Sequence, residues 1–371
     1  MIVLIVIVAV ICLSYVSMVI YWLAGWYKIP EIRHNSRECK HTFSIVVAFY
    51  NEQTYIERCL ESLVNVDYDK QKYEIILVND GSTDHSIEIV KRIVSAYPQA
   101  DITILNREHT GKKRAIQEGV QAAKYELILT TDADCAVMPA WIATYDAYYE
   151  KYAKCMMFGS VAFFSQPRLF NRLQQLEMGS LMVAASGSVG QEKVLMCSAA
   201  NMCYTKNMYI SVQSALEKSN KYISGDDVFL LHACAENYGA TSIGCVRSSQ
   251  ALVYTQAQKS FRSFLRQRIR WAGKAPHYEN RYAKYVALNV ASMSILLIVL
   301  LLLACVNIAG MKFALSVLVV KFLIDMPVLF IWCKYIGKRT LMYLYPLAAI
   351  CYPWYILAVL AGMCGKNRWW K

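Results

Sequence analysis

Several short motifs that mark common protein classes are absent from this sequence of 371 residues. Its 13 cysteines are scattered and include no Cys-x-x-Cys pair, so neither a zinc site nor a disulfide framework is indicated. There is also no Walker lysine loop, and no Gly-x-Gly-x-x-Gly follows a predicted strand. A kinase-like or dinucleotide-binding domain is therefore not predicted.

Charge is scarce as well. Only 18% of the residues are charged, 56% are hydrophobic, and the mean hydropathy is +0.28. A chain of this composition is too apolar for an ordinary soluble enzyme, and the excess of hydrophobic residues lies at its two ends. We therefore expect a multi-pass membrane protein with a soluble middle.

The N-terminal stretch from Met1 to Leu23 carries no charged side chain and is long enough to span a bilayer. A cleaved signal peptide is the alternative. It would need a basic segment before the apolar core and a small-x-small cleavage site, and neither is present. We expect a retained anchor over residues 1–27, with Trp22, Trp26 and Tyr27 in the interfacial aromatic belt.

The C-terminal third contains three more apolar segments, at residues 286–306, 313–332 and 341–364. Lys321 and Asp325 lie in the second, four residues apart, and could pair on a helix. Three spans would put the basic tail on the side opposite the middle domain, which the positive-inside rule disfavours, whereas two would not. We therefore expect two or three spans within residues 286–371.

The net charge of +12 raises the possibility of nucleic-acid binding. However, the lysines and arginines cluster at residues 28–40, 112–114 and 259–284, and two of these clusters adjoin apolar segments. This distribution favours anionic lipid headgroups over a nucleic acid. It also predicts a protein of the cell membrane whose middle domain is cytoplasmic.

The middle of the chain alternates between strand and helix patterns. Strands are predicted at residues 43–49, 73–78, 102–105 and 126–131, and helices at about 55–64, from 84, and 111–123. This alternation predicts an α/β fold with a parallel sheet. Further strands are expected at 156–164 and 242–246, and one basic, aromatic helix is expected over 260–284, at the membrane surface.

Acidic residues follow three of these strands: Glu52, Asp80, and the pair Asp132 and Asp134. The carboxyl ends of parallel strands share one edge of a sheet, so these groups should gather there. Carboxylates brought together repel one another unless a cation is present. Their oxygens suit Mg²⁺ or Mn²⁺, so a metal-bound diphosphate is the expected ligand. Asp226 and Asp227 form a later acidic pair.

At this point a resemblance emerges from an ordered series of motifs. They are Ser44–Glu52, Ile76–Asp84, Gly111–Ala115 with Gly119, Asp132–Asp134, Gly225–Asp227 and Gln267–Trp271. The chain resembles the family 2 glycosyltransferases, which are inverting enzymes of the GT-A (nucleotide-diphospho-sugar transferase) fold, over roughly residues 43–274. The closing Gln-x-x-Arg-Trp is similar to the membrane-bound branch that contains polysaccharide synthases and lipid-directed enzymes.

The resemblance implies a domain order. Residues 1–27 would be the transmembrane anchor and 28–41 a basic linker. Residues 42–258 would be the Rossmann-like GT-A catalytic domain, and 259–285 an interfacial helix that carries the Gln-x-x-Arg-Trp motif. The remaining C-terminal helices would cross the membrane.

The resemblance also implies how the donor is held. Glu52 and Asp80 would contact the base and ribose of the nucleotide, and Lys112 would lie near its phosphates. Asp134 would bind Mg²⁺ or Mn²⁺ directly, and Asp132 would contact the ribose or the metal.

On the acceptor side, the resemblance implies that Asp227 is the catalytic base, with Asp226 as the alternative. Gln267, Arg270 and Trp271 would form a lid, with Arg270 on the leaving diphosphate and Trp271 stacked on the acceptor. The stretch from Ser198 to Met202 resembles the acceptor-side loop of the family, which would make Asn201 a substrate contact.

The implied activity is transfer of a sugar from a nucleotide-diphospho-sugar, most commonly a UDP-sugar in this family, to a lipid-linked or saccharide acceptor. A processive polysaccharide synthase that exports its product is the first alternative, although three or four spans are few for a pore. A non-catalytic membrane scaffold that binds nucleotide sugars is the second.

Overall fold

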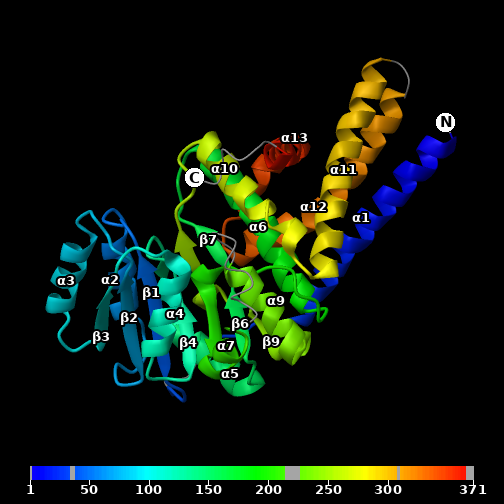
Figure 1. Cartoon of the computed structure of the whole chain (residues 1–371). Helices are drawn as coiled ribbons and strands as arrows, with labels where there is room; N and C mark the ends of the chain where they lie inside the picture. Colours follow the sequence, from blue (N-terminus) through cyan, green and yellow to red (C-terminus); the bar gives the residue numbers. More distant parts are fainter. Residues whose placement is uncertain (1, 34–37, 214–225, 307–309, 365–371) are drawn as a thin grey trace. The chain divides into compact units, whose positions relative to one another are not determined.

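The computed structural model describes residues 2–33, 38–213, 226–306 and 310–364, with Asp226 described by its backbone alone (Figure 1). The chain divides into two compact units. The sheet unit contains Ile29–Phe164 and Met196–Gln256, and the helical unit contains Met1–Lys28, Ser165–Leu195 and Ala257–Lys371. The predicted catalytic domain of residues 42–258 is thus divided between the units, because residues 165–195 belong to the helical unit.

The sheet unit is built on a seven-stranded mixed sheet in the order β3-β2-β1-β4-β8-β6-β9. The strands are β1 (Phe43–Phe49), β2 (Tyr73–Asn79), β3 (Ile102–Asn106), β4 (Leu127–Thr130), β6 (Met156–Gly159), β8 (Met202–Thr205) and β9 (Ile243–Val246). β1, β2, β3 and β4 are parallel to one another, as the sequence predicts, whereas β8 runs antiparallel to both β4 and β6.

The parallel strands form where the apolar runs are continuous. Every residue of β1 and β2 is buried, which is typical of strands covered on both faces. The helices that connect the strands are α2 (Ile56–Val64), α3 (Ser86–Ala96) and α4 (Lys112–Ala122). α4 packs directly on β1, because a Cβ atom at Gly119 would lie 2.4 Å from Cγ1 of Val46.

A second, three-stranded sheet has the order β5-β10-β7, with β5 (Ala136–Val137), β7 (Val161–Phe163) and β10 (Val253–Thr255). The single strand predicted over residues 156–164 is therefore two strands, β6 and β7, in different sheets. They separate at Ser160, whose carbonyl accepts hydrogen bonds from the backbone N–H of Val253 and from the Asn201 amide. The unit also contains α5 (Trp141–Tyr152), α7 (Lys206–Ser211) and α9 (Asp226–Tyr238).

The helical unit contains α1 (Ile2–Lys28), α6 (Leu169–Val189), α10 (Phe261–Ala272), α11 (Arg281–Cys305), α12 (Met311–Tyr335) and α13 (Tyr345–Cys364). Within the described residues, four segments are long and apolar enough to cross a membrane: α1, α11, α12, and Arg339–Cys364, which includes α13. The long apolar helices expected at the two ends of the chain are therefore present and compatible with membrane spans, with three candidates at the C-terminal end. Lys321 and Asp325 pair within α12, as predicted.

The single surface helix predicted over residues 260–284 is wrong in its extent. α10 ends at Ala272, a short 3-10 turn follows at Ala275–His277, and α11 starts at Arg281. Pro276 lies inside that turn, and a proline supplies no backbone N–H to continue a helix. The basic and aromatic residues of the Gln-x-x-Arg-Trp motif all lie on α10, before the break.

α6 is the central helix of its unit. It meets α1 backbone to backbone, because a Cβ atom added at Gly25 would lie 1.8 Å from the carbonyl oxygen of Gly187. It meets α12 at Gly179, where an added Cβ would lie 2.0 Å from the Trp332 ring. Only glycine permits contacts as close as those at Gly25 and Gly179. Further along α6, the hydroxyl group of Ser188 forms a hydrogen bond with that of Tyr282 on α11.

Candidate functional site

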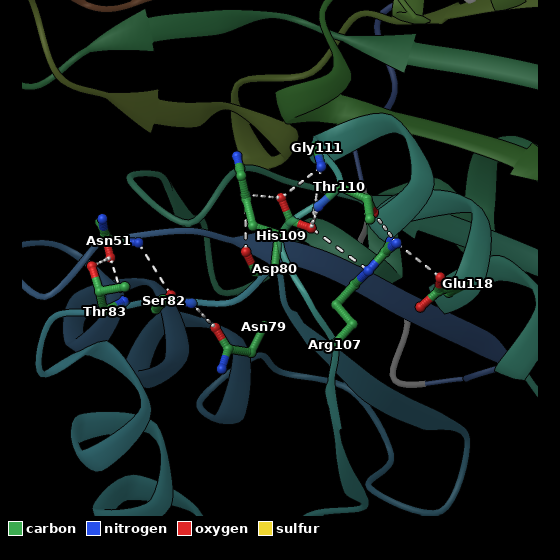
Figure 2. A network of polar contacts seen from close by, with 10 residues as sticks. All are labelled: Asn51, Asn79, Asp80, Ser82, Thr83, Arg107, His109, Thr110, Gly111 and Glu118. Carbon is green, nitrogen blue, oxygen red and sulfur yellow. Dashed lines mark hydrogen bonds and ion pairs between the residues drawn. The ribbon is translucent and has the colours of Figure 1, made fainter.

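The loops that follow β1, β2, β3 and β4 lie at one edge of the sheet, where the four parallel strands end. Asn51 joins the first two of these loops: its side chain accepts from the backbone N–H of Thr83 at 2.8 Å, and its own N–H donates to Ser82 at 3.1 Å (Figure 2). Asn51 adopts a positive φ of 56°, which asparagine tolerates better than most residues. The expected gathering of strand-end loops is thus present.

Asp132 and Asp134 follow β4 directly. Their carboxylates and the thiol of Cys135 offer ligand atoms that lie within 4.8 Å of one another. Burial and the neighbouring Asp132 raise the pKa of Asp134, as expected for two carboxylates without a cation between them. Asp134 is fixed by the hydroxyl of Thr255 at 3.1 Å. Two such carboxylates fit Mg²⁺ or Mn²⁺.

Cys135 completes this cluster without offering a thiolate. Burial, followed by the charges of Asp134 and Asp132, raises the pKa of the Cys135 thiol well above its usual range. The thiol lies 3.3 Å from Oδ1 of Asp134 and donates to it. The carboxylate oxygens of Asp132 and Asp134, which are hard ligands, therefore determine which metal ions the cluster suits.

Lys112 lies on the first turn of α4, and its ammonium group is 2.5 Å from Oδ1 of Asp132. Desolvation opposes its charge, but the carboxylates of Asp132, Asp134 and Asp227 raise its pKa. Lys112 is therefore a firmly charged cation within the electrostatic reach of all three aspartates.

Glu52 lies in the loop after β1 and is half-buried. Burial, and then the charges of Asp134 and Asp132, raise its pKa to about 7. Its backbone N–H donates to Ser86 at 2.8 Å, which ties it to the start of α3. The negative charges of Asp132 and Asp134 therefore act on Glu52.

Asp80 follows β2 and has only 3% of its side chain exposed. Its carboxylate accepts from the backbone N–H groups of Thr110 and Gly111, each at 3.0 Å, and lies 2.8 Å from Nδ1 of His109 (Figure 2). Arg107 approaches it at 3.6 Å. Asp80 therefore holds the loop after β3 against the end of β2.

Asp227 lies at the start of α9. Its carboxylate accepts from the backbone N–H of Ala199 at 3.2 Å and from that of Val228 at 2.8 Å. It also contributes to the field at Lys112. The side chain of Asp226, the alternative base, lies outside the described residues.

Asn201 is fully buried. Its carbonyl oxygen accepts from Trp141 at 2.8 Å and Tyr145 at 2.9 Å, and its amide donates to the carbonyls of Ser160 and Ala251 at 2.8 Å each. These bonds leave no side-chain atom for a ligand. We therefore correct the expectation that Asn201 binds substrate, and assign it to the core of the sheet unit.

Gln267, Arg270 and Trp271 all lie on α10, in the helical unit. Arg268, within the same motif, is buried. It donates to both carboxylate oxygens of Glu177 on α6, at 2.8 and 2.5 Å, and its guanidinium lies 4.3 Å from the Trp271 ring. It also donates to the side chain of Gln267.

Several contacts at the site have no signal in the sequence. Thr255 and Asp134 are far apart in the chain and meet only because β10 pairs with β5 beside the aspartates. His109 is not at a spacing from the other histidines that would suggest a metal ligand. In the sequence, Arg268 cannot be distinguished from the other arginines of the same basic segment. A pattern of single residues cannot show which of them acquires a buried partner.

Comparison with known proteins places this geometry in a family. Residues 44–211 match the model described as glycosyl transferase family 2. The chain carries a family 2 glycosyltransferase domain. This confirms the family predicted from the motif series, and the glycosyltransferase domain holds the strand-end residues described above.

Two curated relatives are similar over part of the domain. Glycosyltransferase AglE from Haloferax volcanii is 29% identical over 99 residues, which is 27% of this chain and 32% of AglE. Poly-beta-1,6-N-acetyl-D-glucosamine synthase from Staphylococcus aureus is 30% identical over 132 residues, which is 33% of this chain and 31% of the synthase. The matches thus span about a third of each relative.

The fold also matches a solved structure. Mannosyltransferase PcManGT from Pyrobaculum calidifontis, in complex with GDP-Man and Mn²⁺, superimposes with a TM-score of 0.60 at 19% identity, covering 95% of this chain and 99% of that one. The predicted GT-A fold with flanking apolar helices is therefore confirmed.

Proposed function

We propose that this protein transfers a sugar from a nucleotide-diphospho-sugar to a hydroxyl group of a lipid-linked or saccharide acceptor at a membrane, with inversion at the anomeric carbon. One observation carries the proposal: Lys112, at the start of α4, lies in the electrostatic field of Asp132 and Asp134, which follow β4, and of Asp227, at the start of α9.

The donor half of the site follows from charge. Asp134, with Asp132, would hold Mg²⁺ or Mn²⁺, which would neutralise the diphosphate when bound. PcManGT, which has the same fold, is described with Mn²⁺ and GDP-Man, and this supports a divalent ion. Lys112 and Arg270 would bind the departing phosphates, while Glu52 and Asp80 would form the nucleoside end.

The acceptor half of the site has one base. The Asp227 carboxylate takes the proton of the acceptor hydroxyl as that oxygen bonds to the anomeric carbon. The bond from the anomeric carbon to the phosphate oxygen breaks in the same step, and a nucleoside diphosphate leaves. Gln267 and Trp271 of α10 would cover the acceptor, with the flat indole face on a sugar ring.

The proposed location follows from the basic clusters beside apolar helices. These clusters favour the cell membrane, with the sheet unit on the cytoplasmic side and anionic lipid headgroups as partners. A UDP-sugar is the proposed donor, because UDP is the common carrier in the family, and GDP-mannose is the comparison donor.

The test is release of nucleoside diphosphate by the purified full-length protein from UDP-sugars and GDP-mannose, with Mn²⁺ or Mg²⁺. We expect release that EDTA abolishes, and we expect Asp227→Asn to lower it by roughly 10²–10⁴-fold. Asp101→Asn is the matched control, since Asp101 precedes β3 at the opposite end of the strands and pairs with Lys124. Undiminished release in Asp227→Asn would refute Asp227 as the base.

A processive synthase is the second candidate, and the relative that makes poly-beta-1,6-N-acetyl-D-glucosamine favours it. The length of the product decides between the two: a single added sugar supports transfer to an acceptor, and a ladder supports polymerisation. Complete absence of release from every donor would favour the non-catalytic scaffold instead.

A further inference from the structure

Two cysteines of the sheet unit lie side by side although they are 79 residues apart in the chain. Cys155 directly precedes β6, Cys234 lies on α9, and their Sγ atoms are 3.5 Å apart. Both are free thiols. The S–S bond of a disulfide is about 2.05 Å long, so the two sulfurs need to approach by only ~1.5 Å to form one.

The fold holds this pair together from several sides. The backbone N–H of Cys155 donates to the carbonyl of Ser242 at 3.1 Å, and its carbonyl accepts from the backbone N–H of Thr205 at 2.9 Å. Ser242 also contacts the second cysteine, since its Oγ lies 3.8 Å from Sγ of Cys234. The proximity of the two thiols is therefore a consequence of how α9 and β6 pack, which the spacing of the cysteines in the sequence does not show.

The two thiols differ in their access to solvent. Cys155 is partly exposed, whereas Cys234 is 0% exposed. A small oxidant can therefore reach the sulfur of Cys155, while Cys234 is shielded behind it. Redox-active cysteines in proteins have this arrangement, with one accessible thiol next to a second that completes a disulfide.

The hydrogen bond between the two sulfurs makes the accessible one the more reactive. Donation by the Cys234 thiol lowers the pKa of Cys155, burial opposes this effect, and the charge of Lys154 assists it. The same hydrogen bond raises the pKa of Cys234. Because the thiolate is the nucleophilic form, Cys155 is the cysteine of the pair that reacts first.

Other uses of a cysteine pair fit these residues less well. A structural zinc ion takes four ligands, and in the part of the chain that the structure describes no third His, Cys, Asp or Glu joins these two sulfurs in a group within 4.8 Å. A permanent disulfide is rare on the reducing, cytoplasmic side proposed for the sheet unit, where the disulfides that occur are usually transient.

We propose that Cys155 and Cys234 form a redox-active pair whose oxidant is a hydroperoxide. The sulfur of Cys155 attacks the O–O bond of hydrogen peroxide and becomes a sulfenic acid, and hydroxide leaves. The sulfur of Cys234 then bonds to that of Cys155, and its proton leaves with the hydroxyl group as water. In total the two thiols lose two electrons and two protons, and the peroxide becomes two waters. The disulfide links α9 to the segment before β6.

The test is mass spectrometry of the purified full-length protein after treatment with a small molar excess of hydrogen peroxide, alkylation of the remaining thiols and digestion without a reductant. We expect two peptides joined through Cys155 and Cys234, with a mass two hydrogens below the sum of the free peptides, and we expect dithiothreitol to separate them. Absence of this link at peroxide concentrations that oxidise Cys39 would overturn the inference.

Two variants assign the roles of the cysteines. In Cys234→Ser the sulfenic acid at Cys155 has no thiol to react with, so its labelling by dimedone should rise severalfold over that in the wild type. In Cys155→Ser, dimedone should not label Cys234. Equal labelling of Cys155 in the wild type and in Cys234→Ser would refute the part assigned to Cys234.

Cys39→Ser is the matched control. Cys39 is also partly exposed, but its sulfur lies 3.5 Å from the backbone nitrogen of Asp69. This variant should form the link as the wild type does. The result for the wild type requires no substitution, and unchanged thermal unfolding would verify that the serine variants fold. No measurement in this series uses a sugar donor, so a failure of this inference leaves the proposed function untouched.

Discussion

Single residues at the site show how strongly a local field depends on neighbours that are distant in sequence. Glu52 follows β1, and the groups that raise its pKa to about 7 follow β4. Its carboxyl group titrates close to physiological pH only because the fold partly removes it from water and surrounds it with like charges. The sequence predicts that these acidic residues gather, but not which of them keeps a proton.

The pKa of Glu52 has a consequence for stability. Between its ordinary value of 4.5 and about 7, the folded protein binds this proton more tightly than the unfolded chain, so the contribution to stability falls as the pH rises through that window. In EDTA, the melting temperature of the wild type should therefore fall relative to that of Glu52→Gln between pH 5 and 7.5. Adding Mn²⁺ should reduce the difference, and parallel pH curves without metal would contradict the assignment.

The pair formed by Arg268 and Glu177 makes a second prediction at this scale. The side chain of Arg268 is 3% exposed and that of Glu177 is 12% exposed, so removing one partner leaves the other as an unpaired buried charge. We expect Arg268→Met or Glu177→Met alone to destabilise the helical unit by ~3–5 kcal/mol, and the double variant to recover most of that loss. Thermal unfolding in one detergent measures all three, and equal losses in the single and double variants would contradict the prediction.

At the scale of helices and strands, the sequence predicts well wherever one element determines its own pattern. The bounds of β1 agree with the predicted residues 43–49, because seven consecutive apolar or small residues are buried on both faces. The division of residues 156–164 between two sheets could not be predicted in this way. It depends on Val253 and Asn201, which approach Ser160 from distant parts of the chain.

Asn201 and the end of α10 differ from the prediction for separate reasons. Asn201 lies in a loop that resembles an acceptor-side motif, and only the packing of Trp141 and Tyr145 shows that its amide is fully used inside the core. The break after α10 has a visible signal in Gly273 and Pro276, but the basic and aromatic composition of residues 260–284 predicts one helix.

The crossing of α1 and α6 supports a prediction at this scale. A Cβ atom added at Gly187 would lie 2.2 Å from the carbonyl oxygen of Trp22, and backbone atoms cannot rotate away as side chains do. Gly187→Ala should therefore separate the two helices and lower the melting temperature by several degrees. Gly310→Ala is the matched control, because no atom of the described residues lies within 4 Å of a Cβ atom there. Equal melting temperatures for both variants would refute the close crossing.

At the scale of the whole molecule, the two units differ in what they contribute. The sheet unit carries the acidic edge, Lys112 and Asp227, and the helical unit carries the Gln-x-x-Arg-Trp motif and all four candidate membrane spans. The sequence predicts both kinds of unit from their composition. It does not show that the chain leaves the sheet unit at Phe164 and returns at Met196, because α6, although 21 residues long, is not apolar enough to be recognised as a membrane span.

The position of α6 determines how this protein can be divided for experiments. Expression of residues 42–258 alone would retain α6 while removing α1, α10, α11 and α12. The surfaces of α6 at Gly179 and Gly187, which pack on α12 and α1, would then be exposed to water. Such a fragment should aggregate even if its sheet is sound. A form confined to the sheet unit should instead join Phe164 to Met196 through a flexible linker and end at Gln256, so that the acidic edge could be studied without the helical unit.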